Sequence, residues 1–230
     1  VYVEKPMARN YDECTDMIQS CHEQRVPLYV AYYRRALPKF LLIKELIEEN
    51  RIGKVQSVRA HLHKTFNPGA GNWRVLPEIS GGGLFVDLAC HLIDVWMMLF
   101  GEFKEYNGLA VNHSGHYPAE DHVVLNIEFE NGVLASGEWF FNSFERKDEC
   151  VITGDHGEIQ FKNHGNDPII VKTASGEEQI SYNYPEHIEQ PFIERINKSL
   201  LGIDELAGNA HDAAKITLLM QEILKPYYSK

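Results

Sequence analysis

The spacing of apolar residues changes along this chain. Up to about residue 50, apolar residues recur every three or four positions, which is the spacing of amphipathic helices. Two helices and two short strands are predicted in this part: strand 1–3, helix 12–24, strand 28–33 and helix 35–50. A strand, a helix and a second strand in this order suit the edge of a parallel sheet and do not make an independent fold.

From residue 55 the apolar residues recur at every second position, as in strands with one buried face. The first such strand, 55–64, places Val58, Ala60 and Leu62 on one face. Its other face carries polar residues: Ser57, Arg59, His61 and His63. Further strands are predicted at 105–111, 122–130, 133–141, 149–153, 158–161, 169–173 and 178–182. Asn131-Gly132 between two of them is a hairpin signal, and hairpins favour antiparallel pairing.

Three more helices are predicted, at 84–100, 185–201 and 210–224, the last two separated by Gly202 and Gly208-Asn209. These helices are few, so they can cover only one face of the sheet. We therefore predict the α+β class, with a large, mostly antiparallel, open-faced sheet covered by helices on one side. The predicted domains are residues 1–35 and residues 36–230.

Composition narrows the classes of function. The chain has 230 residues, 44% of them hydrophobic and 24% charged, which is typical of a globular protein. Its net charge of -11 would repel a polyanion, so no nucleic-acid partner is expected. No apolar run approaches the roughly 18 residues that span a bilayer and no secretory signal is visible, so we expect no membrane partner and a cytoplasmic protein. The cysteines lack a C-x-x-C pair and are expected to be free thiols: Cys14, Cys21, Cys90 and Cys150.

The candidate chemistry lies in the segment that follows Gly81-Gly82-Gly83. Asp87 and His91 are one helical turn apart in an otherwise apolar helix, so they share a face. Burying an ionisable pair is costly unless the two groups pair with each other or with a ligand. The Asp87/His91 pair is therefore a candidate proton-transfer site. His91 would be a suitable base for alcohol oxidation, its charge state and orientation set by Asp87 and a nearby cation. The alternative is a buried histidine that only packs in the core.

Two motifs resemble those of the Gfo/Idh/MocA family, which includes glucose-fructose oxidoreductase, inositol dehydrogenase and the MocA-like proteins. One is Glu4-Lys5-Pro6 after an apolar strand, and the other is the glycine run followed by D-x(3)-H. The resemblance implies an NAD(P)-dependent oxidoreductase acting on a sugar, polyol or related hydroxy or keto compound. It also implies that His91 is the acid/base, that Asp87 assists in substrate and proton handling, and that Lys5 contacts cofactor and substrate hydroxyls. A solvated lysine at a strand end is the alternative for Lys5.

The resemblance implies further site residues and partners. The cofactor, NAD or NADP, would contact Glu4, Lys5 and Pro6. A cleft for a small sugar-like or polyol-like substrate would be lined by Tyr33, Arg34, Trp73, Asp87 and His91. The bare face of the sheet would pack against another subunit, giving a homodimer or homotetramer. The glycine run would let backbone approach the substrate or cofactor.

No metal is expected. Asp94 shares the face of Asp87 and His91, but no second His or Cys joins them at helical spacing. His61 and His63 share a strand face, for which a solvated or interface role is the simpler interpretation.

The sequence contains no G-x-G-x-x-G fingerprint. We therefore expect that 1–35 is the C-terminal remnant of a Rossmann-type nucleotide-binding domain, with roughly the first hundred residues absent. Two other functions stay open: a non-catalytic relative that serves as a binding or scaffold module, and a glycoside hydrolase that runs a redox cycle with tightly held NAD.

Overall fold

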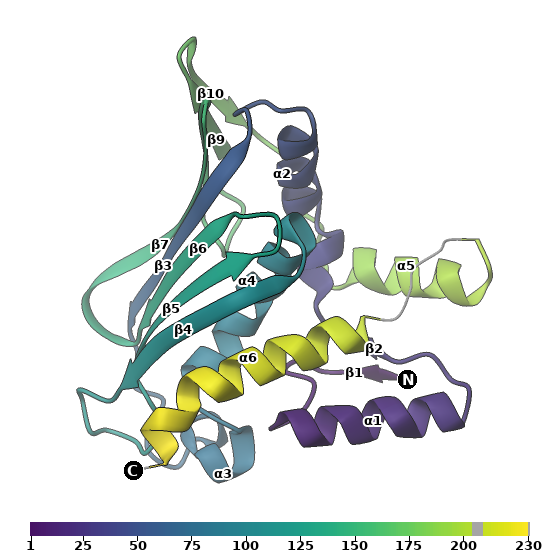
Figure 1. Ribbon diagram of the computed structural model, residues 1–230, viewed down its shortest axis with the longest axis vertical. Helices are drawn as coiled ribbons and strands as arrows, with labels where there is room; N and C mark the ends of the chain where they lie inside the picture. Colours follow the sequence, from purple (N-terminus) through teal and green to yellow (C-terminus); the bar gives the residue numbers. More distant parts are fainter. Residues whose placement is uncertain (204–208, 230) are drawn as a thin grey trace.

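The chain forms one large sheet with helices gathered on one side and a small β-α-β unit beside them (Figure 1). The computed structural model describes residues 1–203 and 209–229, so the predicted separator Gly208 lies outside the described residues. The β-α-β unit consists of β1 (Tyr2–Val3), α1 (Tyr11–Glu23) and β2 (Tyr29–Val30). β1 and β2 pair in parallel, with Tyr2 opposite Tyr29. Asn10 caps α1 by accepting a hydrogen bond from the Glu13 N–H at 2.9 Å.

The large sheet has eight strands in the order β10-β9-β8-β7-β3-β6-β5-β4. Their bounds are β3 (Val55–Thr65), β4 (Phe103–Val111), β5 (His122–Phe129), β6 (Leu134–Phe140), β7 (Asn142–Gly154), β8 (Gly157–Phe161), β9 (Ile169–Thr173) and β10 (Gly176–Ile180). Neighbouring strands are antiparallel except β3 and β6, which pair in parallel with Ser57 opposite Leu134. The α+β class is confirmed, and the sheet is mixed. No local signal in the sequence marks the parallel pair, because the chain returns to β3 only after it has formed β4 and β5.

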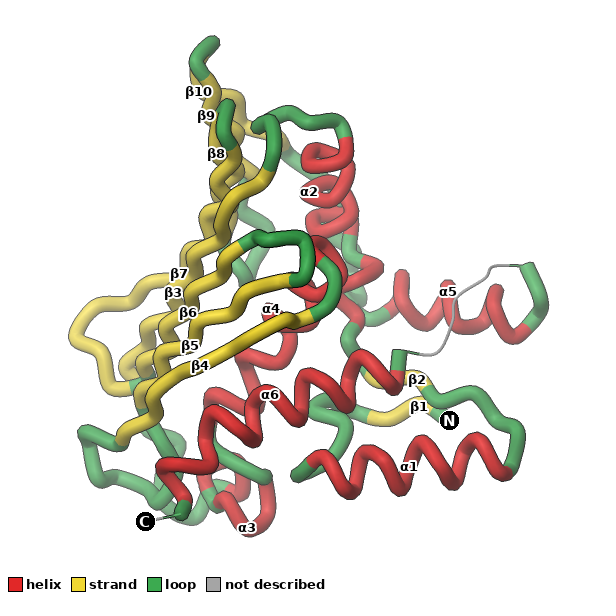
Figure 2. The backbone as a smooth tube through the Cα atoms, viewed as in Figure 1, coloured by secondary structure: helices red, strands yellow, loops and turns green. Residues whose placement is uncertain are grey.

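Helices cover one face of the sheet, as Figure 2 shows by the separation of yellow strands from red helices. The predicted inner residues of β3 are buried: Val58, Ala60 and Leu62 are 1–3% exposed. On this face the ring of Trp139 lies 6.2 Å from that of Trp96 on α4 (Leu84–Phe100). The remaining helical elements are η1 (Tyr33–Ala36), α2 (Pro38–Glu48), η2 (Trp73–Val75), α3 (Pro77–Ser80), α5 (Gln190–Leu200) and α6 (Ala210–Tyr228).

Several predicted elements have the wrong extent. The strand predicted at 178–182 is β10, Gly176–Ile180, and the helix predicted at 185–201 begins at Gln190. Two other strands differ more. The strand predicted at 28–33 ends at Val30, because the chain turns into η1 at Tyr33 and then into α2, which has Pro38 at its start. The strand predicted at 149–153 begins at Asn142, because its polar first half pairs with the end of β3 up to Thr65. Cross-strand pairing therefore extends β7 beyond its apolar residues.

The sequence-based statement that no apolar run approaches membrane-spanning length is wrong for Pro77–Phe100. By length and composition alone this helical stretch could cross a bilayer. However, 78% of its most apolar window is buried inside the protein, against the sheet and α6. Its apolar surface thus belongs to the core, which explains why α4 can hold buried ionisable residues in fixed positions.

Candidate active site

Lys5 and Asp87 form an ion pair between the end of β1 and the first turn of α4. The Lys5 Nζ donates to Asp87 Oδ1 at 2.6 Å and to the Asp87 carbonyl at 2.9 Å. Both side chains are partly buried, at 16% and 23% exposure, so solvent weakens the pair less than on an open surface. The peptide bond from Lys5 to Pro6 is cis. An ammonium carries three N–H donors, so one donor of Lys5 remains for a ligand.

A second cation, Arg74, also contacts Asp87, and the sequence analysis did not assign this arginine to the site. Arg74 Nε lies 3.4 Å from Asp87 Oδ2, and its guanidinium lies 4.5 Å from the centre of the Trp73 ring. Trp73, predicted to line the substrate cleft, is 51% exposed on η2 beside this contact. Arg74 follows Trp73 directly, but only the packing of η2 against α4 shows that it turns toward Asp87.

His91 is buried between aromatic rings. It is 5% exposed, and its ring centre lies 5.1 Å from that of Tyr33 and 6.2 Å from that of Tyr32, both edge-on. The Nδ1 atom is buried without a hydrogen-bond partner among the described residues. Burial lowers the pKa of His91 well below its usual value, and positive neighbours lower it further: Arg34, Lys5 and His164. His91 is therefore neutral near neutral pH, as a proton acceptor must be.

Of the two groups expected to set the charge state of His91, Asp87 and a nearby cation, only cations contribute to the shift of its pKa. The groups that shift the pKa of His91 are cations, while the Asp87 carboxylate contacts Lys5 and Arg74. Helical side chains point toward the N-terminus of their helix, and here that direction brings Asp87 to Lys5. The two residues share a face of α4, but they contact different neighbours.

Arg34 and Arg35 are neighbours in sequence with different environments. Arg35 joins two helices, with Nε 2.7 Å from Asp94 Oδ1 on α4 and Nη1 2.9 Å from Asp212 Oδ2 on α6. Burial raises the pKa of Asp94 to about 7, although Arg35 opposes this shift. Asp94, considered above as a metal ligand, thus belongs to a structural ion pair. Arg34 is 5% exposed, and its guanidinium carbon lies 5.9 Å from the centre of the Phe40 ring.

The glycine run contacts the protein's own backbone, while its approach to substrate or cofactor stays a prediction. Gly81 has φ 79°, and a Cβ there would collide with the carbonyl of Arg9. A Cβ on Gly83 would lie 2.8 Å from the Glu120 carbonyl. The N–H of Gly83 also donates to Glu120 Oε1 at 2.8 Å. These contacts explain the run, because only glycine fits there, and they fix the start of α4 and hence Asp87.

Glu4 and Cys90 complete the residues singled out from the sequence. Glu4 is exposed beside Lys5, and its carboxylate accepts the Lys5 N–H at 3.3 Å. Contact of Glu4, Lys5 and Pro6 with a cofactor stays a prediction. Cys90 is fully buried, and burial raises the pKa of its thiol to about 12, so it packs and does not act as a nucleophile. The predicted free thiols are unpaired in the structure: Cys14, Cys21, Cys90 and Cys150.

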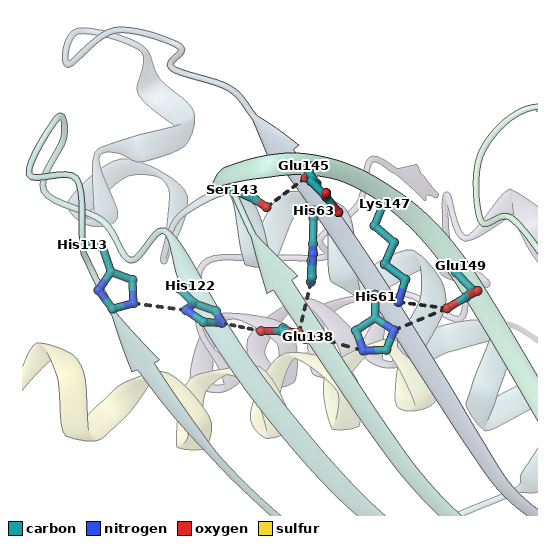
Figure 3. A network of polar contacts seen from close by, with 9 residues as sticks. All are labelled: His61, His63, His113, His122, Glu138, Ser143, Glu145, Lys147 and Glu149. Atoms are coloured by element: carbon teal, nitrogen blue, oxygen red, sulfur yellow. Dashed lines mark hydrogen bonds and ion pairs between the residues drawn. The ribbon is translucent and has the colours of Figure 1, made fainter.

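A separate network of polar residues lies on the open face of the sheet, as Figure 3 shows. Glu138 on β6 accepts hydrogen bonds from Nε2 of His122 at 2.9 Å and from Nε2 of His63 at 3.0 Å. His113 Nε2 extends the chain to His122 Nδ1 at 3.1 Å. His61 is more distant, at 3.9 Å from Glu138. These residues point away from the helices and so do not belong to the His91 site.

Comparison with known proteins finds similar sequences and folds among oxidoreductases. Oxidoreductase P35 of Formosa agariphila is 38% identical over 229 residues, which cover 96% of this chain and 69% of that protein. Levoglucosan dehydrogenase of Pseudarthrobacter phenanthrenivorans is 28% identical over 203 residues, covering 76% of this chain and 52% of that protein. A structure of a levoglucosan dehydrogenase with NADH and levoglucosan superposes with a TM-score of 0.85 at 24% identity, covering 99% of this chain and 71% of that one.

The family model for the GFO/IDH/MocA C-terminal domain matches residues 40–160. The chain therefore belongs to the Gfo/Idh/MocA family of oxidoreductases.

Proposed function

We propose that this chain forms the substrate-binding part of an NAD(P)-dependent dehydrogenase acting on a sugar, a polyol or a related hydroxy or keto compound. The observation that carries the proposal is a buried His91 whose Nδ1 has no partner among the described residues. Lys5, one of its positive neighbours, keeps a free N–H donor. The similarities support it, since a relative is named a levoglucosan dehydrogenase and a solved neighbour contains NADH and levoglucosan.

The nicotinamide, when bound, would supply hydride acceptance and donation at its C4 atom. The residues of this chain handle the proton and the position of the substrate. His91 would accept the hydroxyl proton as the carbon loses its hydride, which requires the neutral imidazole that burial ensures. Lys5 would donate its remaining N–H to the reacting oxygen. Asp87 would hold Lys5 in place through the 2.6 Å ion pair.

We infer that residues 1–35 are the end of a nucleotide-binding sheet. β1 and β2 pair in parallel and are joined by α1, as in such sheets. Glu4, Lys5 and Pro6 directly follow β1, and ligands of parallel α/β sheets bind at the carboxyl ends of strands. With no G-x-G-x-x-G in the sequence, the pyrophosphate of NAD or NADP would be held by residues outside 1–230.

We also propose that a second copy of the chain covers the open face of the sheet. This face carries apolar side chains that are unusually exposed, with Leu109 at 76%, Leu134 at 56% and Val124 at 38%. Val124 lies opposite Glu138 in the pairing of β5 with β6, and Leu109 lies opposite Val124 in the pairing of β4 with β5. Self-complementary contact across a two-fold axis is the simplest closed arrangement for such a face.

The test is turnover by the full-length enzyme with a panel of sugars and polyols. Transfer of deuterium from a labelled carbinol carbon to the oxidised nicotinamide is the expected result. Release of a sugar from a glycoside with no net change in reduced nicotinamide would contradict this proposal and indicate a glycoside hydrolase. Binding of sugar and cofactor without any reaction would replace it with a scaffold function.

A further inference from the structure

Arg34 is a buried cation without a counter-charge. Its side chain is 5% exposed, yet it makes no ion pair or side-chain hydrogen bond with any residue that the structure describes. Its guanidinium carbon lies 5.9 Å from the centre of the Phe40 ring. Arg35, by contrast, has two carboxylate partners. A largely buried guanidinium with no carboxylate beside it is available to an anionic ligand, which points to a ligand as the source of the anion.

Other cations surround Arg34. Lys39 is 1% exposed, donates to the carbonyl of Lys162, and lies 5.8 Å from the centre of the Phe161 ring. Burial, together with the charge of Arg34, lowers the pKa of Lys39 to about 8. Burial likewise lowers the pKa of Lys64, with Arg34 again among the positive neighbours. Arg34 is thus an electrostatic neighbour of Lys39, Lys64 and His91 together.

The carboxylates in this region already have partners. The acidic neighbours of Lys39 and Lys64 are Asp87, Asp148 and Asp167. Asp148 accepts from His164 Nδ1 at 2.7 Å, and Asp167 pairs with Lys162 at 2.8 Å. Asp87 is held by Lys5 and Arg74. The described acidic residues therefore leave Arg34 and Lys64 without an ion-pair partner.

A cavity of about 450 Å³, beside the end of β3 and the neighbouring part of β7, is also lined mainly by cationic side chains. It is lined by His63, Lys64, Thr65, Phe66, Arg146, Lys147, Asp148 and Lys162. Its walls carry more cations than carboxylates, in a chain whose net charge is -11. The positive charge here is therefore local and does not reflect the protein as a whole. Clefts of this kind concentrate anionic ligands, and the volume lies within the range of small-molecule sites.

We propose that the substrate is a sugar acid whose carboxylate is bound by Arg34, with Lys64 and Arg146 on its path of entry. The inference rests on the proposed dehydrogenase function. A single guanidinium in a fixed position presents a planar pair of donors that matches the two oxygens of a carboxylate. Arg34 is an electrostatic neighbour of His91, so a carboxylate held there would bring a hydroxyl of the same sugar toward the base.

The experiment compares matched substrates in the full-length enzyme: glucose with glucuronate, galactose with galacturonate, and glucose 6-phosphate as a different anion. We expect kcat/KM for an acid to exceed that for its neutral partner by about 10², in line with sites built around a specific polar group. Equal kcat/KM for acid and neutral sugar would overturn the inference. A higher kcat/KM for glucose 6-phosphate than for the sugar acids would overturn the claim that Arg34 binds a carboxylate.

Two variants test the residues. Arg34→Gln should lower kcat/KM for the acid about 10²-fold, mostly through KM, and that for the neutral sugar by less than about threefold. Arg146→Gln at the exposed rim of the cavity should lower kcat/KM for the acid by a few-fold. This variant tests the inference if Arg34→Gln fails to fold. The matched control is Arg25→Gln, an exposed arginine that follows α1 and lies outside the large sheet. Equal losses for acid and neutral sugar in Arg34→Gln would show a structural role only.

Direct binding separates the inference from the proposed function. Calorimetry with glucuronate, in the wild type and in Arg34→Lys, measures the anion site without turnover. Binding that weakens about tenfold or more in Arg34→Lys supports the site even if no hydride transfer occurs, because lysine lacks the planar pair of donors. Absence of glucuronate binding by an enzyme that oxidises neutral sugars would overturn the inference and leave the dehydrogenase function in place.

Discussion

Asp87 and His91 lie one turn apart on α4, yet they contact different groups: the Asp87 carboxylate accepts from Lys5 Nζ at 2.6 Å, while the buried His91 Nδ1 has no partner among the described residues. We therefore propose different tasks for the two residues. Asp87 positions an ammonium, whereas His91 is kept neutral by burial and by surrounding cations.

Replacement of the base or of the ammonium should reduce turnover in the full-length enzyme. His91→Ala and Lys5→Ala are each expected to lower kcat by about 10² or more, the usual loss for a general base or a positioning cation. Circular dichroism and thermal melting establish that the variants fold. Near wild-type turnover by a folded His91→Ala enzyme would require a different acid/base.

The two cations at Asp87 should differ in importance. Asp87→Asn removes the charge that holds Lys5 and should lower kcat by about tenfold or more, with a smaller change in KM. Arg74→Gln is the matched variant, because Arg74 is exposed and its contact with Asp87 is longer, at 3.4 Å. We expect it to change kcat less than threefold, roughly the limit for an exposed ion pair. An equal or greater loss in Arg74→Gln would contradict the central place of the Lys5–Asp87 pair.

Stability should fall on the acid side of neutrality because of His91. Its pKa in the folded protein is below the unfolded value of about 6.5, so the unfolded state binds a proton more readily. The neutral, buried imidazole therefore contributes stability above about pH 6.5, and this contribution is lost as the pH falls toward the folded pKa. Urea unfolding between about pH 7.5 and pH 5 should show a smaller loss in His91→Gln than in the wild type.

The control for this measurement is His156→Gln, since the His156 side chain is 78% exposed. It should keep the wild-type dependence of unfolding free energy on pH. The hypothesis fails if His91→Gln and His156→Gln have the same slope.

Self-association should depend on the open face of the sheet. Light scattering at micromolar concentration is expected to report at least a dimer, and Leu109→Glu should shift it toward monomer by placing a charge on an apolar contact. Leu201→Glu is the matched control, because Leu201 is 74% exposed but follows α5, outside the sheet. A monomeric mass for the wild type across dilutions would refute the proposed interface.

The network at Glu138 gives a second test of the same face. Burial opposes ionisation, but hydrogen bonds from His122 and His63 outweigh it and keep the pKa of Glu138 below its usual value. Glu138→Gln retains the size of the side chain and removes its charge. If two copies meet over this network, the variant should weaken association at neutral pH, measured by sedimentation. Unchanged association would place the contact elsewhere on the face.

The sequence alone determined the elements whose formation depends on neighbouring residues. The helix predicted at 84–100 has those bounds in the structure, since its apolar run starts after Gly83 and stops at Gly101. The alternation in β3 predicted its buried face, because side chains in a strand alternate strictly. The motifs also indicated the family, which the comparisons confirmed.

Tertiary structure decided everything that depends on residues far apart in the chain. Lys5 and Asp87 are separated by 82 positions, and no local pattern shows that they meet. Arg34 and Arg35 are equivalent in sequence, but the packing of α4 and α6 gives Arg35 two carboxylates and leaves Arg34 with none among the described residues. Sequence periodicity predicts which face a residue occupies, whereas its charge partners depend on how those faces pack together.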